Sequence, residues 1–289
     1  MASVWVRQRL PWAAFLLLAA YLALFGIAMV GKYGIGWDAH AYYVAWSGGL
    51  YEELPETRDA YNYSPLFAQA IWPLTLLPWP VFCAVLVGAA GAGVLWLSRP
   101  LPPVLAVGMW LFCLPEILSG NVFWLLAVLT VVGFSRGSPW CVAAFTKVLP
   151  CLGPVWFLVR REWRQLAGFV AVSAALLGVS VAISPGEWVD WIDFLRDSAG
   201  DSSGNVYLTP LTLTFPLAAR LPLALVVAVV AARTDRRWLL PVAMLVASPV
   251  VGWGSFALLA AIPRLRGMAS SDLDEDRASS DSGTRSLTS

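Results

Sequence analysis

Long apolar segments recur along the chain and constrain its fold more than any other feature. They fall roughly at residues 12–30, 79–97, 101–118, 121–135, 139–159, 165–183, 211–232 and 238–263. Only 13% of the 289 residues are charged, whereas soluble domains carry about 25%. A membrane-spanning helix needs about 20 mainly apolar residues, and segments this long lack the alternation of barrel strands. We therefore predict an all-α, polytopic integral membrane protein.

Arginines at the ends of these segments predict how the chain crosses the membrane. They precede the first segment and follow the second, fourth, fifth, seventh and last: Arg7, Arg9, Arg99, Arg136, Arg160, Arg161, Arg164, Arg233, Arg236, Arg237, Arg264 and Arg266. Because basic residues favour the cytoplasmic side, we expect these turns and both termini in the cytoplasm. The acidic, aromatic loops 31–64 and 184–210 would lie outside. Residues 1–266 would form one transmembrane domain, and 267–289 a disordered cytoplasmic tail.

Two segments, 139–159 and 238–263, begin and end on the same predicted side. Each has helix breakers near its centre, at 147–150 and 248–254. Proline and glycine interrupt helices, and broken helices at membrane depth line cavities. Each segment is therefore a pair of short helices or a re-entrant hairpin, or else a kinked span with one arginine turn outside.

Composition argues against several kinds of site. The formal net charge of +1 gives no reason to expect nucleic acid. All four cysteines lie within apolar segments and the chain has one histidine, so we predict no disulfide, metal site or cofactor. The first segment lacks a clear small-residue cleavage site, so we expect a retained span rather than a signal peptide.

Two charged residues beside or within apolar segments are the leading functional candidates. Asp38 follows the first segment, where a carboxylate is either a catalytic base or a solvated loop acid or helix cap. Lys147, one of two lysines, lies inside an apolar segment, where an ammonium needs a partner. That partner is either a lipid phosphate or an acid such as Glu116, unless the side chain snorkels to the interface.

Other polar and aromatic residues accompany these two. His40 lies two residues after Asp38, while Glu116 and Asn121 flank a Ser-Gly turn that ordinary turn chemistry also explains. Asp59 is expected to be a solvated loop acid. The first outer loop concentrates five tyrosines, Tyr42, Tyr43, Tyr51, Tyr61 and Tyr63. Aromatic rings beside acids suit sugar binding, and they also form interfacial belts.

Several short motifs follow one another in a characteristic order. They are Asp38, Tyr42-Tyr43, Gly48 to Tyr51, Tyr61 to Pro65, Gly120 to Phe123, Lys147 to Pro150 and Ser248 to Trp253. Each is similar to one motif of a known family, in the same order. The family's motifs are an Asp, Tyr-Tyr, Gly-x-x-Tyr, Tyr-x-Tyr-x-Pro, Gly-Gln-x-Asn, Lys-x-x-Pro and Ser-Pro-x-x-Trp. The set resembles the GT-C glycosyltransferases, most closely glycosyltransferase family 87, a group of polyprenyl-phosphate-mannose-dependent mannosyltransferases.

The resemblance implies a GT-C-like bundle of about eight to ten transmembrane or half-membrane helices with two extracytoplasmic loops. It implies inverting transfer of a hexose, mannose in this family, from a polyprenyl- or dolichyl-phosphate donor. The acceptor would be lipid-linked or a glycan, at the outer face of a prokaryotic plasma membrane. Asp38 would be the general base and Lys147 would bind the donor phosphate, without a metal. Substrate contacts are implied for His40, Tyr42, Tyr43, Tyr63, Glu116, Asn121 and Trp253.

Two other functions remain open from the sequence. A transporter or flippase would line a lipid or polar-substrate path with Asp38 and Lys147, and a non-catalytic relative would only bind lipid-linked sugar. Transporter sites lie at the midplane between repeats. Here the acid is in a loop and no repeat is visible, which favours an enzyme.

Overall fold

The apolar segments fold into helices in the computed structural model, which describes residues 2–53, 59–200 and 216–268. The helices are α1 (Ala2–Tyr33), α2 (Ala39–Val44), α3 (Pro65–Thr75), α4 (Trp79–Ser98), α5 (Pro103–Phe112), α6 (Leu114–Ser119), α7 (Phe123–Val132), α8 (Trp140–Thr146), α9 (Gly153–Arg160), α10 (Trp163–Ile183), α11 (Pro185–Gly200), α13 (Leu217–Arg233), η1 (Arg237–Leu239), α14 (Leu240–Ala247) and η2 (Trp253–Ala261). No strand occurs within the described ranges. The predicted all-α fold is confirmed.

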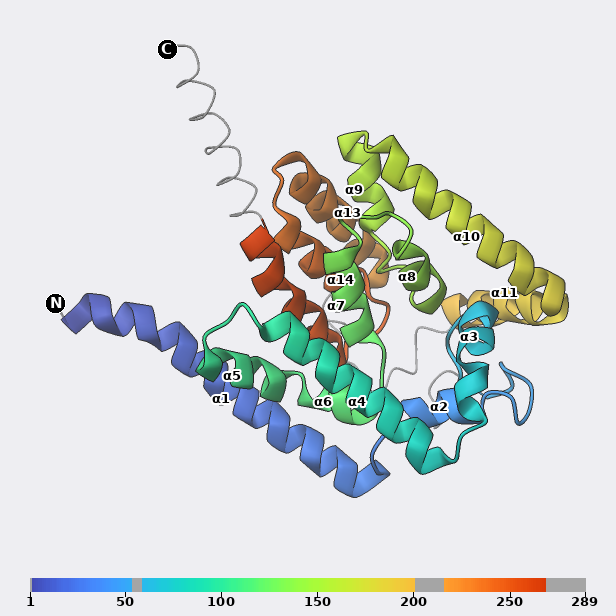
Figure 1. Ribbon diagram of the computed structural model, residues 1–289, viewed down its shortest axis with the longest axis horizontal. Coiled ribbons are helices and arrows are strands. Elements are labelled where there is room, and N and C mark those ends of the chain that lie inside the picture. Colours follow the sequence, from blue (N-terminus) through green and yellow to red (C-terminus); the bar gives the residue numbers. More distant parts are fainter. Residues whose placement is uncertain (1, 54–58, 201–215, 269–289) are drawn as a thin grey trace, which may run out of the picture.

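Three helical stretches are long and apolar enough to cross a bilayer: Leu10–Tyr33 of α1, all of α4, and all of α10. Leu17 on α1 is 73% exposed and Ile183 on α10 is 65% exposed. Apolar surface of this extent is stable against lipid rather than water. Figure 1 shows α1 and α10 on opposite sides of the molecule, with shorter helices between them.

The predicted breakers divide the segments in which they lie. Segment 139–159 becomes α8 and α9, because Lys147 is extended (φ −140°, ψ 95°) where α8 ends. Segment 238–263 becomes η1 with α14, then η2, and the break follows Ser248, which is also extended. Proline opens α9 and α14 at the first or second position, where its missing N–H costs nothing. Both segments are therefore pairs of short helical pieces.

Two hydrophobic cores hold these helices together. The larger one joins α7, α8, α9, α14 and η2 around fully buried Trp140, Phe157 and Met244. The smaller one packs the first outer loop against α3 and α4, with Tyr42 and Tyr61 among its members. The described part of this loop is therefore a folded cap, and it places polar groups at fixed positions.

The two ends of the bundle differ in chemistry. At one end, arginine-bearing turns meet, since Arg160 Nη1 lies 2.9 Å from Asp235 Oδ1 and Arg264 Nε donates to Trp96 O at 2.7 Å. At the other end, α11 lies across the tip of α10 beside α3 (Figure 1). Trp188 Nε1 on α11 donates to Ser180 Oγ on α10 at 3.0 Å. Residues 54–58, 201–215 and 269–289, which include parts of both predicted outer loops and most of the predicted tail, lie outside the described residues.

Packing in the larger core predicts a sensitive glycine. A Cβ on Gly153, the first residue of α9, would lie 2.1 Å from ring atoms of the buried Trp140. Overpacking of this kind costs about 1–3 kcal/mol, so Gly153→Ala should lower the thermal unfolding midpoint measured in detergent. Gly168→Ala on α10 is the matched control, because its Cβ meets nothing within 4 Å. Equal midpoints for both variants would show that Trp140 moves aside without cost.

Candidate functional site

The predicted site residues on and beside helix α2 lie on two different sides of this helix. Asp38 is its N-cap and already has helical backbone angles (φ −84°, ψ −34°). Residues three or four apart share a side of a helix, whereas residues two apart do not. Asp38 and Tyr42 therefore lie on one side, and His40 and Tyr43 on another, where their rings are 6.5 Å apart.

The turn after α6 fixes the position of Asp38. The Asp38 N–H donates to Ser119 O at 3.0 Å, and the Gly36 N–H donates to Leu118 O at 2.8 Å. Gly120 ends α6 with φ +70°, and a Cβ there would lie 2.6 Å from the Ala39 Cβ. Glycine satisfies both the left-handed backbone and the close approach. Two backbone hydrogen bonds and this close contact therefore hold the first outer loop against the α6–α7 turn.

A hydrogen-bonded chain connects Asp38 to Lys147. Asn121 Nδ2 donates to Asp38 Oδ2 at 2.9 Å, and Tyr63 OH donates to Asn121 Oδ1 at 3.2 Å. Lys147 Nζ donates to Tyr63 OH at 3.3 Å, and the hydroxyls of Tyr42 and Tyr63 are 2.9 Å apart. Five of the residues predicted from sequence therefore meet in one cluster, although they come from four separate parts of the chain.

Lys147 is held by aromatic rings and a phenol. Its Nζ lies 4.3 Å from the ring centre of Phe123 and 4.8 Å from that of Tyr63, distances at which cation–π attraction operates. Within the described ranges no carboxylate forms an ion pair with it. The half-buried ammonium therefore has no carboxylate in direct contact among the described residues, which suits it to an anionic ligand.

Glu116 interacts with the charge of Lys147 but forms no ion pair with it within the described ranges. The side chain is fully buried, and its Oε1 accepts a hydrogen bond from the Trp124 N–H at 3.1 Å. Its Oε2 has no hydrogen-bond partner in the described part of the chain. A Cβ on Gly254 would lie 2.5 Å from this oxygen, so Glu116 faces the start of η2.

The electrostatics of the cluster favour a base at Asp38. Burial raises the pKa of Asp38, while the Asn121 hydrogen bond and the charge of Lys147 lower it, and the net direction is upward. A raised pKa makes a carboxylate a stronger base. The residue as a whole is half-buried.

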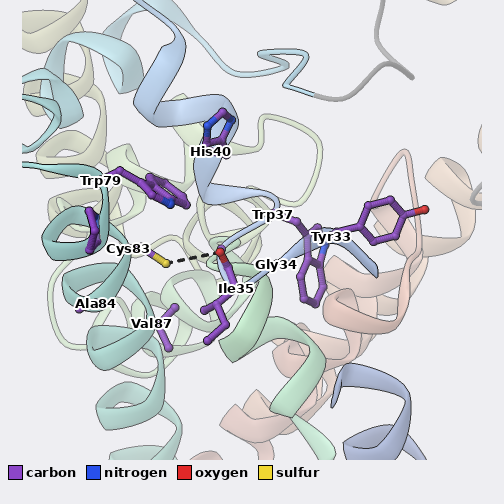
Figure 2. A pocket seen from close by; sticks show the side chains of 11 residues that line it. Tyr33, Gly34, Ile35, Trp37, His40, Trp79, Cys83, Ala84 and Val87 are labelled. Atoms are coloured by element: carbon purple, nitrogen blue, oxygen red, sulfur yellow. Dashed lines mark hydrogen bonds between the residues drawn. The ribbon is translucent and has the colours of Figure 1, made fainter. Parts of the chain in front are cut away.

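His40 and Tyr43 lie apart from this cluster. His40 Nδ1 is 2.7 Å from Asp59 Oδ1, and the His40 ring packs edge-on to Trp79 at 4.9 Å. Tyr43 also contacts Trp79, at 5.3 Å. The prediction of a solvated Asp59 is therefore wrong, since pairing with His40 leaves its side chain only 26% exposed. Figure 2 shows His40 and Trp79 at a groove that Cys83 and Val87 also line.

Trp253 does not join the cluster either. It packs at the start of η2 against Tyr21 and Phe25 of α1, with ring centres 6.2 and 6.0 Å away. The sequence analysis did not identify one buried polar residue near the start of η2. Arg220, buried in α13, donates to Ser248 O at 2.7 Å and to Pro249 O at 2.9 Å. An arginine inside an apolar segment is the signal that could have found it.

Comparison with known proteins gives one match. A family model described as glycosyltransferase family 87 matches residues 61–267, more than half of the chain. The matched range contains Tyr63, Asn121 and Lys147, whereas Asp38 and α2 precede it. No curated protein and no solved structure matches the chain.

Proposed function

Because the chain belongs to glycosyltransferase family 87, and is thus a membrane glycosyltransferase, we propose that it transfers a hexose from a polyprenyl-phosphate donor. The sugar is mannose, and the acceptor is a hydroxyl of a lipid-linked or glycan substrate. The cluster around Asp38 is the active site, and it works at the extracytoplasmic face of the plasma membrane. The one-sided arginines of the sequence support this orientation.

One observation carries the proposal: a carboxylate and an ammonium stand at the two ends of one hydrogen-bonded chain. Asn121 and Tyr63 link Asp38 to Lys147 in steps of 2.9, 3.2 and 3.3 Å. No direct ion pair between the two charges is present. A displacement at a sugar–phosphate bond needs these two groups on opposite sides of the sugar, a base for the nucleophile and a cation for the leaving group.

Asp38 and Lys147 then have different roles in a single displacement reaction. Asp38 takes the proton of the acceptor hydroxyl while the acceptor oxygen forms a bond to the anomeric carbon. The bond from that carbon to the phosphate oxygen breaks, and the electron pair leaves with the polyprenyl phosphate. Lys147 stabilises the growing negative charge on the phosphate. A single displacement of this kind inverts the anomeric configuration.

The raised pKa of Asp38 predicts the pH dependence of transfer. A general base works ionised, so the rate should fall as pH drops through the raised pKa, above the ordinary aspartate value of about 3.9. Asn121→Ala removes a hydrogen bond that favours the charged carboxylate, so its acid limb should lie at higher pH still. Transfer rates measured from acid to neutral pH in both proteins test this. Coincident acid limbs would mean that Asp38 is not the group that titrates.

A further inference from the structure

Glu116 on α6 carries a buried carboxyl group that the proposed mechanism does not use. The side chain has no exposed surface, and its Oε2 has no hydrogen-bond partner among the described residues. Burying a carboxyl group is unfavourable unless its oxygens are paired. The one side-chain bond that Glu116 makes within the described ranges, from Oε1 to the Trp124 N–H at 3.1 Å, is therefore the best indication of what the residue does.

This bond caps helix α7 from the preceding helix. Trp124 is the second residue of α7, and the first N–H groups of a helix have no partner within it. Val122, at the N-cap position, has no polar side chain, so Glu116 supplies the capping oxygen instead. Ser119 Oγ holds the other end of the α6–α7 turn, accepting from the Asn121 N–H at 3.2 Å and donating to Glu116 O at 3.0 Å.

The turn that Glu116 holds contacts both charged ends of the active-site cluster. Asn121 donates to Asp38 Oδ2 at 2.9 Å, and the ring centre of Phe123 lies 4.3 Å from Lys147 Nζ. The next residue of α7 is the one that Glu116 binds. A shift of the first turn of α7 would therefore disturb the base and the cation together, and a misplacement of about 1 Å can lower a reaction rate about 100-fold.

The reach of the Glu116 side chain is fixed from two sides. On the side of η2, a Cβ on Gly254 would lie 2.5 Å from Oε2 and 3.6 Å from the Glu116 Cα. On the side of α7, the bond to Trp124 is close to the upper limit of about 3.2 Å for ordinary N–H···O hydrogen bonds. A side chain shorter by one methylene group would lose this bond.

We propose that Glu116 is a positioning residue, which orients Asp38 and Lys147 by holding the first turn of α7. Asn121 transmits the effect to the carboxylate and Phe123 transmits it to the ammonium. The inference rests on the function proposed above and adds to it a residue that touches no reacting atom. Because the effect travels through a hydrogen bond, it depends on the reach of the side chain and not on its charge.

Two substitutions separate the bond of Glu116 from its charge. Glu116→Gln keeps an oxygen within reach of the Trp124 N–H but carries no charge, whereas Glu116→Asp keeps the charge and is one methylene shorter. Glu116→Asp should lower the rate of sugar transfer about 10- to 100-fold, and Glu116→Gln should retain most of it. Equal rates for the two variants, or a slow Gln variant beside an intact Asp variant, would overturn the proposal.

The pH dependence of transfer distinguishes positioning from simple stabilisation of the fold. The charged and titratable groups that face Asp38 are those of Tyr42, Glu116 and Lys147. The Asn121 hydrogen bond favours ionised Asp38, so Glu116→Asp should move the acid limb to higher pH, as Asn121→Ala does. The double variant should show no further shift, because both changes act through one bond. A lower unfolding midpoint with an unmoved acid limb, or shifts that add, would contradict positioning.

Asparagine side chains give a readout that needs no sugar transfer. The chain has three asparagines, Asn62, Asn121 and Asn205. Protein labelled with ¹⁵N-asparagine in lipid nanodiscs therefore gives three side-chain amide signals, and the one missing from Asn121→Ala identifies Asn121. This signal should shift in Glu116→Asp and stay in place in Glu116→Gln. An unmoved signal in Glu116→Asp would defeat the positioning role alone, whereas the expected shift in a protein that transfers no sugar would defeat the proposed function.

Discussion

Asp38→Asn is expected to lower the rate of sugar transfer by about 100- to 10,000-fold, the usual loss when a general base is removed. The amide is nearly the same size as the carboxylate, and its oxygen still accepts the hydrogen bond from Asn121. It cannot take the acceptor proton. Donor binding and the thermal unfolding midpoint should therefore stay close to those of the wild type, and only turnover should fall in assays with saturating donor.

The control for this variant is a loop-side acid without a role in the cluster. Asp193 is exposed on α11 and pairs only with the exposed Arg196 at 2.8 Å among the described residues. Surface pairs of this kind contribute little, so Asp193→Asn should transfer sugar normally. Asp59 is unsuitable as a control because it holds His40. Transfer by Asp38→Asn at the rate of Asp193→Asn would remove Asp38 from the mechanism.

Lys147→Met is expected to lower kcat/KM for the lipid-phosphate donor about 100-fold, comparable with the loss of one group that stabilises developing negative charge. The methionine chain is similar in length and apolar, but it loses the ammonium and with it the hydrogen bond to Tyr63 OH and both cation–π contacts. Lys147→Arg should recover part of the loss, because the charge returns with a different geometry. Saturation kinetics with the donor varied measure all three proteins.

The chain's other lysine supplies the comparison for Lys147. Lys32 lies in the last turn of α1, where its Nζ is 4.8 Å from the ring centre of Tyr33. Lys32→Met should use the donor as the wild type does. If Lys147→Met matches it, and both unfold at the wild-type temperature, then Lys147 only fills space between two aromatic rings.

Much of the fold can be predicted from the sequence, because backbone groups in lipid must be hydrogen-bonded within helices or closed barrels. The segment predicted at 165–183 is α10, at 163–183, and the segment at 79–97 is α4, at 79–98. Breakers beside Lys147 and Ser248 divide their segments, as backbone chemistry requires. Segment 101–118 is also divided, into α5 and α6, and its Pro115 is a signal that could have indicated this.

The residues of the candidate site are harder to predict from the sequence than the helices, because their positions depend on which side of a helix each residue occupies. The resemblance implied that His40 contacts the substrate, two residues from Asp38, yet residues two apart are separated by about 200° around a helix of 3.6 residues per turn. Tyr42, four residues from Asp38, is on the correct side and hydrogen-bonds to Tyr63. Trp253 packs against α1 through long-range contacts, which no local pattern encodes.

The proposed glycosyl transfer is tested most directly by incubating purified, reconstituted wild-type protein with radiolabelled polyprenyl-phosphate mannose and a membrane lipid extract. We predict that label passes to an acceptor, that polyprenyl phosphate is released, and that GDP-mannose does not replace the lipid donor. Movement of the intact labelled lipid across the bilayer with no bond broken would indicate a flippase. Transfer from GDP-mannose alone would contradict the proposed donor and the role of Lys147.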